Sequence, residues 1–196
     1  MERSYREAIE REGVPYILTA LMDCIEDIEL DNIIMVTDYK TQIRGIDYAI
    51  KGDNKELVYI DSKFHLNNSN SSIMPIEVTK FNGLQGWGID TTLSTDYILD
   101  LTKNYGYYVL DCHKLHSFML QHLNKYPSIY NRHGEEGKKH TKAVPIQNLI
   151  EAEVIIYQKR WDDTMAINKK NIEASAYYKN YIEPKLNKLV HSSMSA

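Results

Sequence analysis

Apolar residues recur at helical spacing near the start of the chain. In the segment 14–29 they fall three or four positions apart, which predicts a helix with one buried face. These residues are Ile17, Leu18, Leu21, Ile25 and Ile28. The segment 2–12 is also predicted to be helical, and Gly13, Val14 and Pro15 are predicted to break the two helices, with Pro15 in the first turn of the second.

Shorter runs with the apolar, β-branched and aromatic composition of strands follow this helical region. The segments predicted to be extended are 32–37, about 44–51, 56–64, 72–81, 95–101 and 105–112. A turn cluster at 52–54 joins the second and third of these segments, so the pair is predicted to form a β-hairpin. Pro75 places its segment at a sheet edge or at the start of a strand.

The remaining segments are predicted to be loops and helices. Residues 82–90, which hold three glycines, and the polar residues 128–142 are predicted to be loops. Helices are predicted at about 114–125 and over 161–190 as far as Pro184, and residues 143–149 are predicted to be a short strand that enters a helix. This order of helices and strands predicts an α/β fold, in which a mixed central sheet is flanked by helices.

The composition is that of a globular protein, with 43% hydrophobic and 26% charged residues in a chain of 196. This length suits one domain with a full core better than two small ones. No apolar run is as long as a transmembrane helix, and the charged N-terminal segment lacks the apolar centre of a signal peptide. Cys24 and Cys112 lie far apart in apolar surroundings, which indicates buried thiols rather than a disulfide or a zinc cluster. We therefore expect a cytoplasmic protein with no membrane segment.

Charge is distributed unevenly along the chain. The formal net charge is −4, which by itself does not indicate a nucleic-acid-binding protein. Residues 1–37 carry three arginines and nine acidic residues, so the rest of the chain holds 20 basic and 18 acidic residues, a net charge of +2. Carboxylates at a metal site would also be neutralised by bound cations. Net charge therefore leaves nucleic-acid binding open.

Two aspartates and a lysine lie in the predicted hairpin, where an unpaired carboxylate is costly. Side chains alternate along a strand, so Asp61 and Lys63 share one face with Tyr59. The opposite face carries Val58, Ile60 and Phe64. If the turn centres on Asn54, Asp47 lies directly opposite Asp61, because each is seven residues from that centre. Opposed side chains have Cβ atoms about 5 Å apart, and like charges at that separation repel each other.

Repulsion between Asp47 and Asp61 predicts a partner that relieves it, either a shared proton or a hard cation. Mg²⁺ is commonly bound by one or two carboxylates together with water and phosphate oxygens. With Lys63 beside it as a point charge, such a site suits phosphodiester hydrolysis, in which a metal activates water and a lysine stabilises developing charge. The alternative is a solvent-facing edge that these charges keep soluble, which is the commoner explanation for this spacing taken alone.

The segment GIDYAI…LVYIDSK resembles the PD-(D/E)XK nuclease superfamily, whose core pattern is an Asp on one strand and Asp/Glu-Xaa-Lys on its neighbour. Asp47 matches the first position, and Asp61 and Lys63 match the other two. More narrowly, the segment 38–101 is similar to a group of phage and bacterial proteins of uncharacterised role with a D…Q…GID…IDxK pattern. The flanking positions that carry this likeness are Asp38, Gln42, Gly45, Glu77, Gly86 and Trp87.

The resemblance implies the roles of the site residues. Asp47, Asp61 and the main-chain carbonyl of Ser62 would bind Mg²⁺ or Mn²⁺. Lys63 would orient the attacking water and stabilise the phosphorane. Residues considered for an additional role in this site are Asp23, Glu26, Glu77 and Gln42. Each of these also has a structural interpretation: Asp23 and Glu26 as part of a solvent-exposed helix face, Glu77 as a surface strand residue and Gln42 as a turn residue.

Two other groups of polar residues give weaker signals. Zinc would need further ligands beside the one histidine pair at helical spacing, and a partly exposed helix face explains His113, His116 and His122 better. Phosphate contacts are weakly predicted for Arg132, Lys138, Lys139 and Lys142, and for the segment 158–161, with solvated charge as the alternative. The 15 tyrosines include side chains able to stack on bases, although half-buried packing explains most of them.

The function predicted from these features is that of a metal-dependent DNA endonuclease. The resemblance implies one restriction-endonuclease-like domain over 1–196, with a catalytic core at about 15–125 and a C-terminal helical part at about 146–190. Cutting both strands of a duplex usually needs two sites, which is compatible with a homodimer. The alternatives are a catalytically silent module of the same fold that binds nucleic acid or protein, and a nuclease directed to RNA or to DNA junctions.

Overall fold

Two β-sheets with surrounding helices make up the computed structural model, which describes residues 3–52, 56–66, 72–80, 83–103, 105–131 and 139–187. Among these residues, a six-stranded sheet has the order β1-β2-β3-β5-β6-β9 and a three-stranded sheet has the order β4-β8-β7. The strands of the larger sheet are β1 (Ile33–Met35), β2 (Tyr48–Lys51), β3 (Leu57–His65), β5 (Tyr97–Thr102), β6 (Gly106–Asp111) and β9 (Ile155–Arg160). Those of the smaller sheet are β4 (Ile73–Thr79), β7 (Ser128–Asn131) and β8 (Lys139–Pro145).

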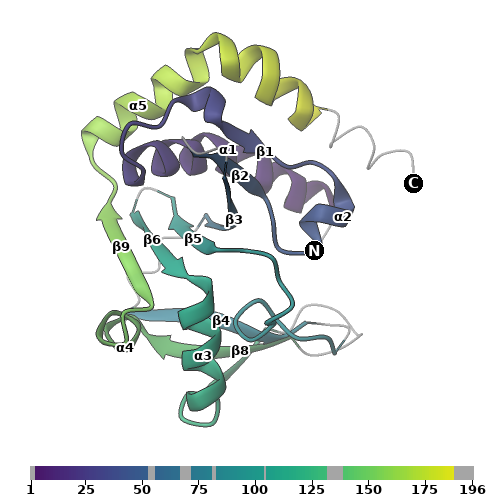
Figure 1. Cartoon of the computed structure of the whole chain (residues 1–196), viewed down its shortest axis with the longest axis vertical. Coiled ribbons are helices and arrows are strands. Elements are labelled where there is room, and N and C mark those ends of the chain that lie inside the picture. The colour runs from purple at the N-terminus through teal and green to yellow at the C-terminus, as the bar shows by residue number, and fades with distance from the viewer. Residues whose placement is uncertain are drawn as a thin grey trace.

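Helices cover the larger sheet, with α1 (Arg3–Cys24) and α5 (Asp163–Ala174) together on one side of it (Figure 1). Helix α3 (Cys112–His122) and the smaller sheet lie at the other end of the molecule in the same view. The remaining helical elements are a 3₁₀ turn (Leu30–Asn32), α2 (Tyr39–Gln42), α4 (Ile146–Glu151) and the π-helical turn η2 (Tyr178–Ile182). Within the described ranges, none of the helices combines the length and apolar character needed to span a bilayer.

The larger sheet is mixed, as the sequence predicts. Strands β1, β2 and β3 form an antiparallel meander, whereas β3 and β5 run parallel. A parallel pair needs a long crossover, and here the crossover contains β4 and a turn-rich segment around Trp87. The α/β class and the mixed central sheet flanked by helices are therefore confirmed.

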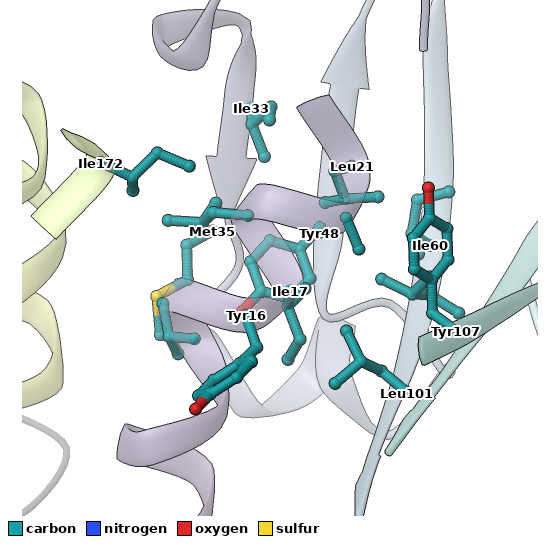
Figure 2. Close-up of a cluster of buried hydrophobic side chains, with 14 of the residues drawn as sticks. Tyr16, Ile17, Leu21, Ile33, Met35, Tyr48, Ile60, Leu101, Tyr107 and Ile172 are labelled. Carbon is teal, nitrogen blue, oxygen red and sulfur yellow. The ribbon is translucent and has the colours of Figure 1, made fainter. Parts of the chain in front are cut away.

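Alternation along the strands gives the larger sheet two different faces. Ile60 on β3 and Leu101 on β5 join residues of α1 and α5 in one buried cluster, part of which Figure 2 shows. Ile98 on β5 and Leu110 on β6 face the opposite way, into a second cluster with residues of α3, α4 and β4. Each fully buried Ile or Leu contributes about 1.5–3 kcal/mol to folding. Because Asp61 follows Ile60 along β3, its carboxylate lies on the second face.

The predicted break between two N-terminal helices is wrong, because α1 is continuous from Arg3 to Cys24 with Pro15 inside it. Gly13 does not break the helix; its lack of a side chain allows α1 to pack closely against Phe64 on β3. A Cβ atom at Gly13 would lie 2.7 Å from Cγ of Phe64, closer than side chains normally pack. The apolar face of the second predicted helix does form, since Ile17, Leu18 and Leu21 are buried.

The C-terminal half contains strands that the sequence pattern does not reveal. The polar segment 128–142, predicted to be a loop, contains β7 and part of β8, which pair with each other. Strand β9 is absent from the predictions because only Ile155 of its six residues is buried, as expected for an edge strand with little apolar character. Helical structure also continues through Pro184 to residue 187.

Candidate active site

The β2–β3 register brings the two predicted aspartates together. Tyr48 pairs with Ile60 and Ala49 with Tyr59, so the next positions outward are Asp47 and Asp61. Beyond the last pair, the main-chain NH of Asp47 donates to the carbonyl of Ile60 at 2.9 Å, one residue out of the β2–β3 register. The predicted register is therefore confirmed for the pairs from Tyr48–Ile60 to Lys51–Leu57, whereas residues 53–55 lie outside the described ranges.

The carboxylate of Asp47 is held against β3. Its Oδ2 atom accepts hydrogen bonds from the main-chain NH of Ser62 and from the Ser62 hydroxyl, each at 2.9 Å. These two bonds fix the side chain across the strand pair, because β2 has ended and its ladder no longer satisfies the Ser62 NH. Ser62 therefore orients Asp47 through its NH and its hydroxyl, a role beyond the main-chain carbonyl that the resemblance implies.

Asp61 is the most buried acidic side chain among the described residues, with 3% of its surface exposed. Its Oδ1 atom lies 2.6 Å from Nζ of Lys63. Burial is the largest influence on the pKa of Asp61 and raises it, Lys63 lowers it and Asp47 raises it, and together these effects place the pKa at about 7. The repulsion expected between two neighbouring carboxylates therefore favours the protonated form of Asp61.

Lys63 remains cationic in this setting. Burial alone would lower the pKa of Lys63, but Asp61, Asp47 and Glu77 together raise it above its ordinary value. The ammonium group lies 5.9 Å from the centre of the Trp87 ring, within cation–π range. The side chain is 27% exposed, so the ammonium group lies at the boundary between the protein interior and solvent.

Glu77 reaches the surroundings of Lys63 from another sheet. It lies on β4, which follows β3 along the chain but pairs with β8 in the smaller sheet. Glu77 is 8% exposed, and its main-chain carbonyl accepts a hydrogen bond from Gly88 at 2.9 Å. This bond ties the turn around Trp87 to β4, so that one segment places both Glu77 and the Trp87 ring near Lys63.

Two of the additional predicted residues do not join the site. Asp23 lies against the opposite face of the sheet, where it forms an ion pair with Lys159 and accepts a hydrogen bond from the Tyr107 hydroxyl at 2.6 Å. Glu26 is exposed after the end of α1. The side chain of Gln42 donates to the carbonyl of Val36 at 3.1 Å, which agrees with its interpretation as a turn residue.

The weaker predictions have separate outcomes. Lys142 donates to the carbonyl of Tyr126 at 3.1 Å and to the Ser128 hydroxyl at 3.0 Å, which are structural contacts within the smaller sheet. Arg132 and Lys138 lie outside the described residues, as does the side chain of Lys139. The histidines near α3 are spread out: His113 is exposed, His122 packs on Phe118, and His116 is buried. In the described part of the chain no group of three or more His, Cys, Asp or Glu residues is arranged to hold a metal ion.

One acidic residue and one histidine beside this centre were not predicted from the sequence. Lys63 pairs across the parallel strands with Asp100, which is 6% exposed. Oδ2 of Asp100 lies 3.1 Å from Nε2 of His65, whose side chain is 42% exposed. Two signals pointed to this pair: His65 continues the alternation of Asp61 and Lys63 along β3, and Asp100 interrupts an apolar strand run.

Comparisons with models of known families, with curated proteins and with solved structures find no match to this chain.

Proposed function

We propose that this protein is a metal-dependent nuclease, and that the site on β2 and β3 hydrolyses a phosphodiester bond. The observation that carries the proposal is the cluster of Asp47, Asp61 and Lys63 at the point where β2 ends beside β3. The charge of Asp47 acts on Asp61, and Nζ of Lys63 lies 2.6 Å from Oδ1 of Asp61. A carboxyl group whose pKa is shifted by burial and by neighbouring charges is typical of functional sites.

The residues present fit a divalent cation of the Mg²⁺ type. Mg²⁺ is bound through one or two carboxylates and otherwise keeps water or substrate oxygens, so two aspartates suffice and a third protein ligand is not required. Asp61 and Asp47 would hold the ion, with the carbonyl of Ser62 as an additional oxygen. The bound ion would supply an activated water and would polarise the phosphate group.

The chain's own residues have distinct roles in this proposal. The two hydrogen bonds from Ser62 hold Asp47 in one orientation, so this carboxylate need not reorganise when substrate binds. Lys63 places a positive charge where a phosphodiester oxygen develops negative charge, and its partly exposed ammonium group can reach such an oxygen. The ring of Trp87 limits the directions in which that ammonium group can move.

The second candidate is a module of the same fold that binds nucleic acid or protein without cleaving it. The observation that favours it is the direct ion pair between Lys63 and Asp61, which occupies both groups in the structure as it stands. This ion pair would have to break before Asp61 could bind a metal ion or Lys63 could contact a phosphate. DNA, RNA and junction substrates are all compatible with the site as described.

A cleavage assay tests the proposal. Supercoiled plasmid, single-stranded DNA and single-stranded RNA are incubated with the protein and Mg²⁺, Mn²⁺ or EDTA. Asp61→Asn and Lys63→Ala are run beside the matched controls Asp31→Asn and Lys114→Ala, which change exposed residues outside the site. We expect metal-dependent cleavage that Asp61→Asn and Lys63→Ala reduce by at least about 10²-fold and the controls leave intact. Cleavage that persists in EDTA or in both site variants would overturn the assignment.

A further inference from the structure

A row of polar side chains runs across the sheet from the candidate active site to the edge strand. Lys63 on β3 pairs with Asp100 on β5, Asp100 with Tyr108 on β6, and Tyr108 with Gln158 on β9. Directly paired residues in a sheet project their side chains to the same face. All four side chains therefore lie on the face that carries Asp61, in one line perpendicular to the strands.

A second row lies one pleat further along the strands. It begins at His65 on β3 and passes through Thr102 and Gly106 to Arg160 on β9. The two rows end side by side on β9, where Gln158 and Arg160 are both exposed. The strands from β3 to β9 are separated by three spacings of about 4.8 Å, so the rows reach about 14 Å from Lys63.

A pocket of about 330 Å³ occupies this end of the rows and is lined by Tyr105, Tyr107, Tyr108, Gln158, Lys159 and Arg160. The guanidinium group of Arg160 lies 5.9 Å from the centre of the Tyr105 ring. Arg160 forms no ion pair with any carboxylate in the described part of the chain. The pocket thus combines a cation that has no acidic partner among the described residues, an aromatic ring beside it and an exposed amide.

Tyr108 connects the pocket to the candidate active site. Burial raises the pKa of the Tyr108 hydroxyl, and Tyr105 and Asp100 raise it further, while Arg160 opposes them. Tyr105 and Tyr108 both line the pocket, and Tyr105 is one of the groups that act on the Tyr108 hydroxyl. Asp100 is in turn the cross-strand neighbour of Lys63. The register therefore connects the pocket to the site through one row of residues on the same face of the sheet.

We propose that this pocket is a subsite for a flanking nucleotide of a single-stranded nucleic acid whose phosphodiester backbone passes Lys63. The inference rests on the proposed function for the position of the strand, and it adds the substrate class. A stacked strand advances about 3.4 Å per nucleotide, so 14 Å corresponds to about four nucleotides between Lys63 and the pocket.

The chemistry of the pocket matches each part of a nucleotide. Arg160 binds a phosphate oxygen through its planar group of donors, a geometry that arginine provides and lysine does not. The ring of Tyr105 offers a face on which a base can stack whatever its identity. Gln158 supplies an amide that can donate to or accept from a base edge. Lys159 does not take part, because its ammonium group is paired with Asp23 on the opposite face.

Fluorescence anisotropy with a labelled thymidine octanucleotide tests the subsite independently of cleavage. Binding is measured in EDTA on an Asp61→Asn background, which separates strand binding from hydrolysis. Arg160→Gln and Tyr105→Ala are compared with Arg11→Gln, which removes an exposed arginine from α1 on the other side of the sheet. We expect Arg160→Gln and Tyr105→Ala each to weaken binding at least about fivefold. Arg160→Gln should also reduce the slope of log affinity against log salt by about one, because one phosphate contact is lost.

The outcomes separate this inference from the proposed nuclease. If the parent cleaves DNA but Arg160→Gln and Tyr105→Ala bind the octanucleotide as Arg11→Gln does, the subsite is overturned and the nuclease stands. If the parent does not cleave but Arg160→Gln weakens binding and lowers the salt slope, the subsite stands in a binding module. A parent that does not bind the octanucleotide at all overturns the subsite. Circular dichroism and thermal melting of each variant show whether the altered protein is folded.

Discussion

Nζ of Lys63 lies 2.6 Å from Oδ1 of Asp61, and both residues project from the same face of β3. A lysine and a carboxylate two residues apart on a strand are neighbours only along one face, so this ion pair is local to β3. Asp47 adds a second carboxylate from β2, which leaves two acidic groups for one cation at a nearly dry position. Burial, with a smaller contribution from Asp47, outweighs the opposing effect of Lys63, and together these effects place the pKa of Asp61 at about 7.

This pKa predicts how stability depends on pH in the absence of metal. Asp61 binds its proton more tightly in the folded state than in the unfolded state, where its pKa is near 3.8. Its contribution to stability is therefore complete below about pH 3.8 and is lost as the pH rises through about 7. Asp61→Asn has no carboxyl group at this position and so has no such loss. Between pH 4 and pH 8 the unfolding free energy of the variant should therefore rise relative to that of the parent by about 2–4 kcal/mol. Urea denaturation of both proteins in EDTA measures this change.

The control for this pH prediction is Asp31→Asn, which removes an exposed carboxyl group. Its unfolding free energy should follow that of the parent across the same pH range. A constant difference between Asp61→Asn and the parent would mean that Asp61 titrates in the folded protein as it does in the unfolded chain.

Addition of a divalent cation should reverse the destabilisation that Asp61 causes above neutral pH. A cation that binds only the folded protein stabilises it by about 2.7 kcal/mol when its concentration is 100 times its dissociation constant. We expect Mn²⁺ to raise the melting temperature of the parent at pH 8 and to have little effect on Asp47→Asn or Asp61→Asn. Asp31→Asn should respond as the parent does. An equal response of all four proteins would place the bound Mn²⁺ elsewhere.

The part of the site that could be predicted from sequence is the part defined by local alternation. Asp61 and Lys63 fall on one face of a strand whatever the rest of the fold does, and the hairpin register brings Asp47 close to Asp61. The segments 32–37, 44–51 and 56–64 were predicted to be extended, and they contain β1, β2 and most of β3. The extended segments 95–101 and 105–112, which correspond to β5 and β6, were likewise predicted because both have strong apolar runs.

The parts that could not be predicted depend on contacts distant in sequence. Strand β9 is mostly exposed and owes its conformation to its pairing with β6, so its own residues carry little signal. Asp23 was a candidate because the resemblance implies an acidic residue from the first helix, but α1 covers the opposite face and its end meets Lys159 on β9. The position of Glu77 near Lys63 depends on the packing of one sheet against another. Contacts of this kind leave no regular spacing of apolar and polar residues in the sequence, so a sequence pattern cannot reveal them.

The turn that joins Glu77 to Trp87 requires a glycine at position 86. A Cβ atom at Gly86 would lie 2.5 Å from the carbonyl oxygen of Glu77 and 2.6 Å from its carbonyl carbon, so main-chain atoms would have to move. Gly86→Ala should therefore lower the unfolding free energy by about 1–3 kcal/mol and displace Glu77 relative to Lys63. Gly52→Ala is the matched control, since its Cβ atom would meet only the carbonyl of Glu56 at 3.5 Å. Equal stability of the two variants in urea denaturation would contradict the packing of this turn.

His116 determines where Trp87 can lie, and through it the surroundings of Lys63. Nε2 of His116 is 2.9 Å from the carbonyl oxygen of Trp87, and the histidine is 4% exposed. Its neutral form can donate this hydrogen bond, and burial lowers the pKa of His116 because a charged imidazole is unfavourable there. His116→Ala should cost about 1–3 kcal/mol at pH 7.5, since it leaves a buried carbonyl without its donor. As the pH falls below 6.5, the parent alone loses the stability that neutral His116 provides, so the difference between the two proteins should shrink. The exposed His113 supplies the control His113→Ala, for which no comparable cost is expected; a loss as large as that of His116→Ala would show that the cost comes from α3 and not from the bond to Trp87.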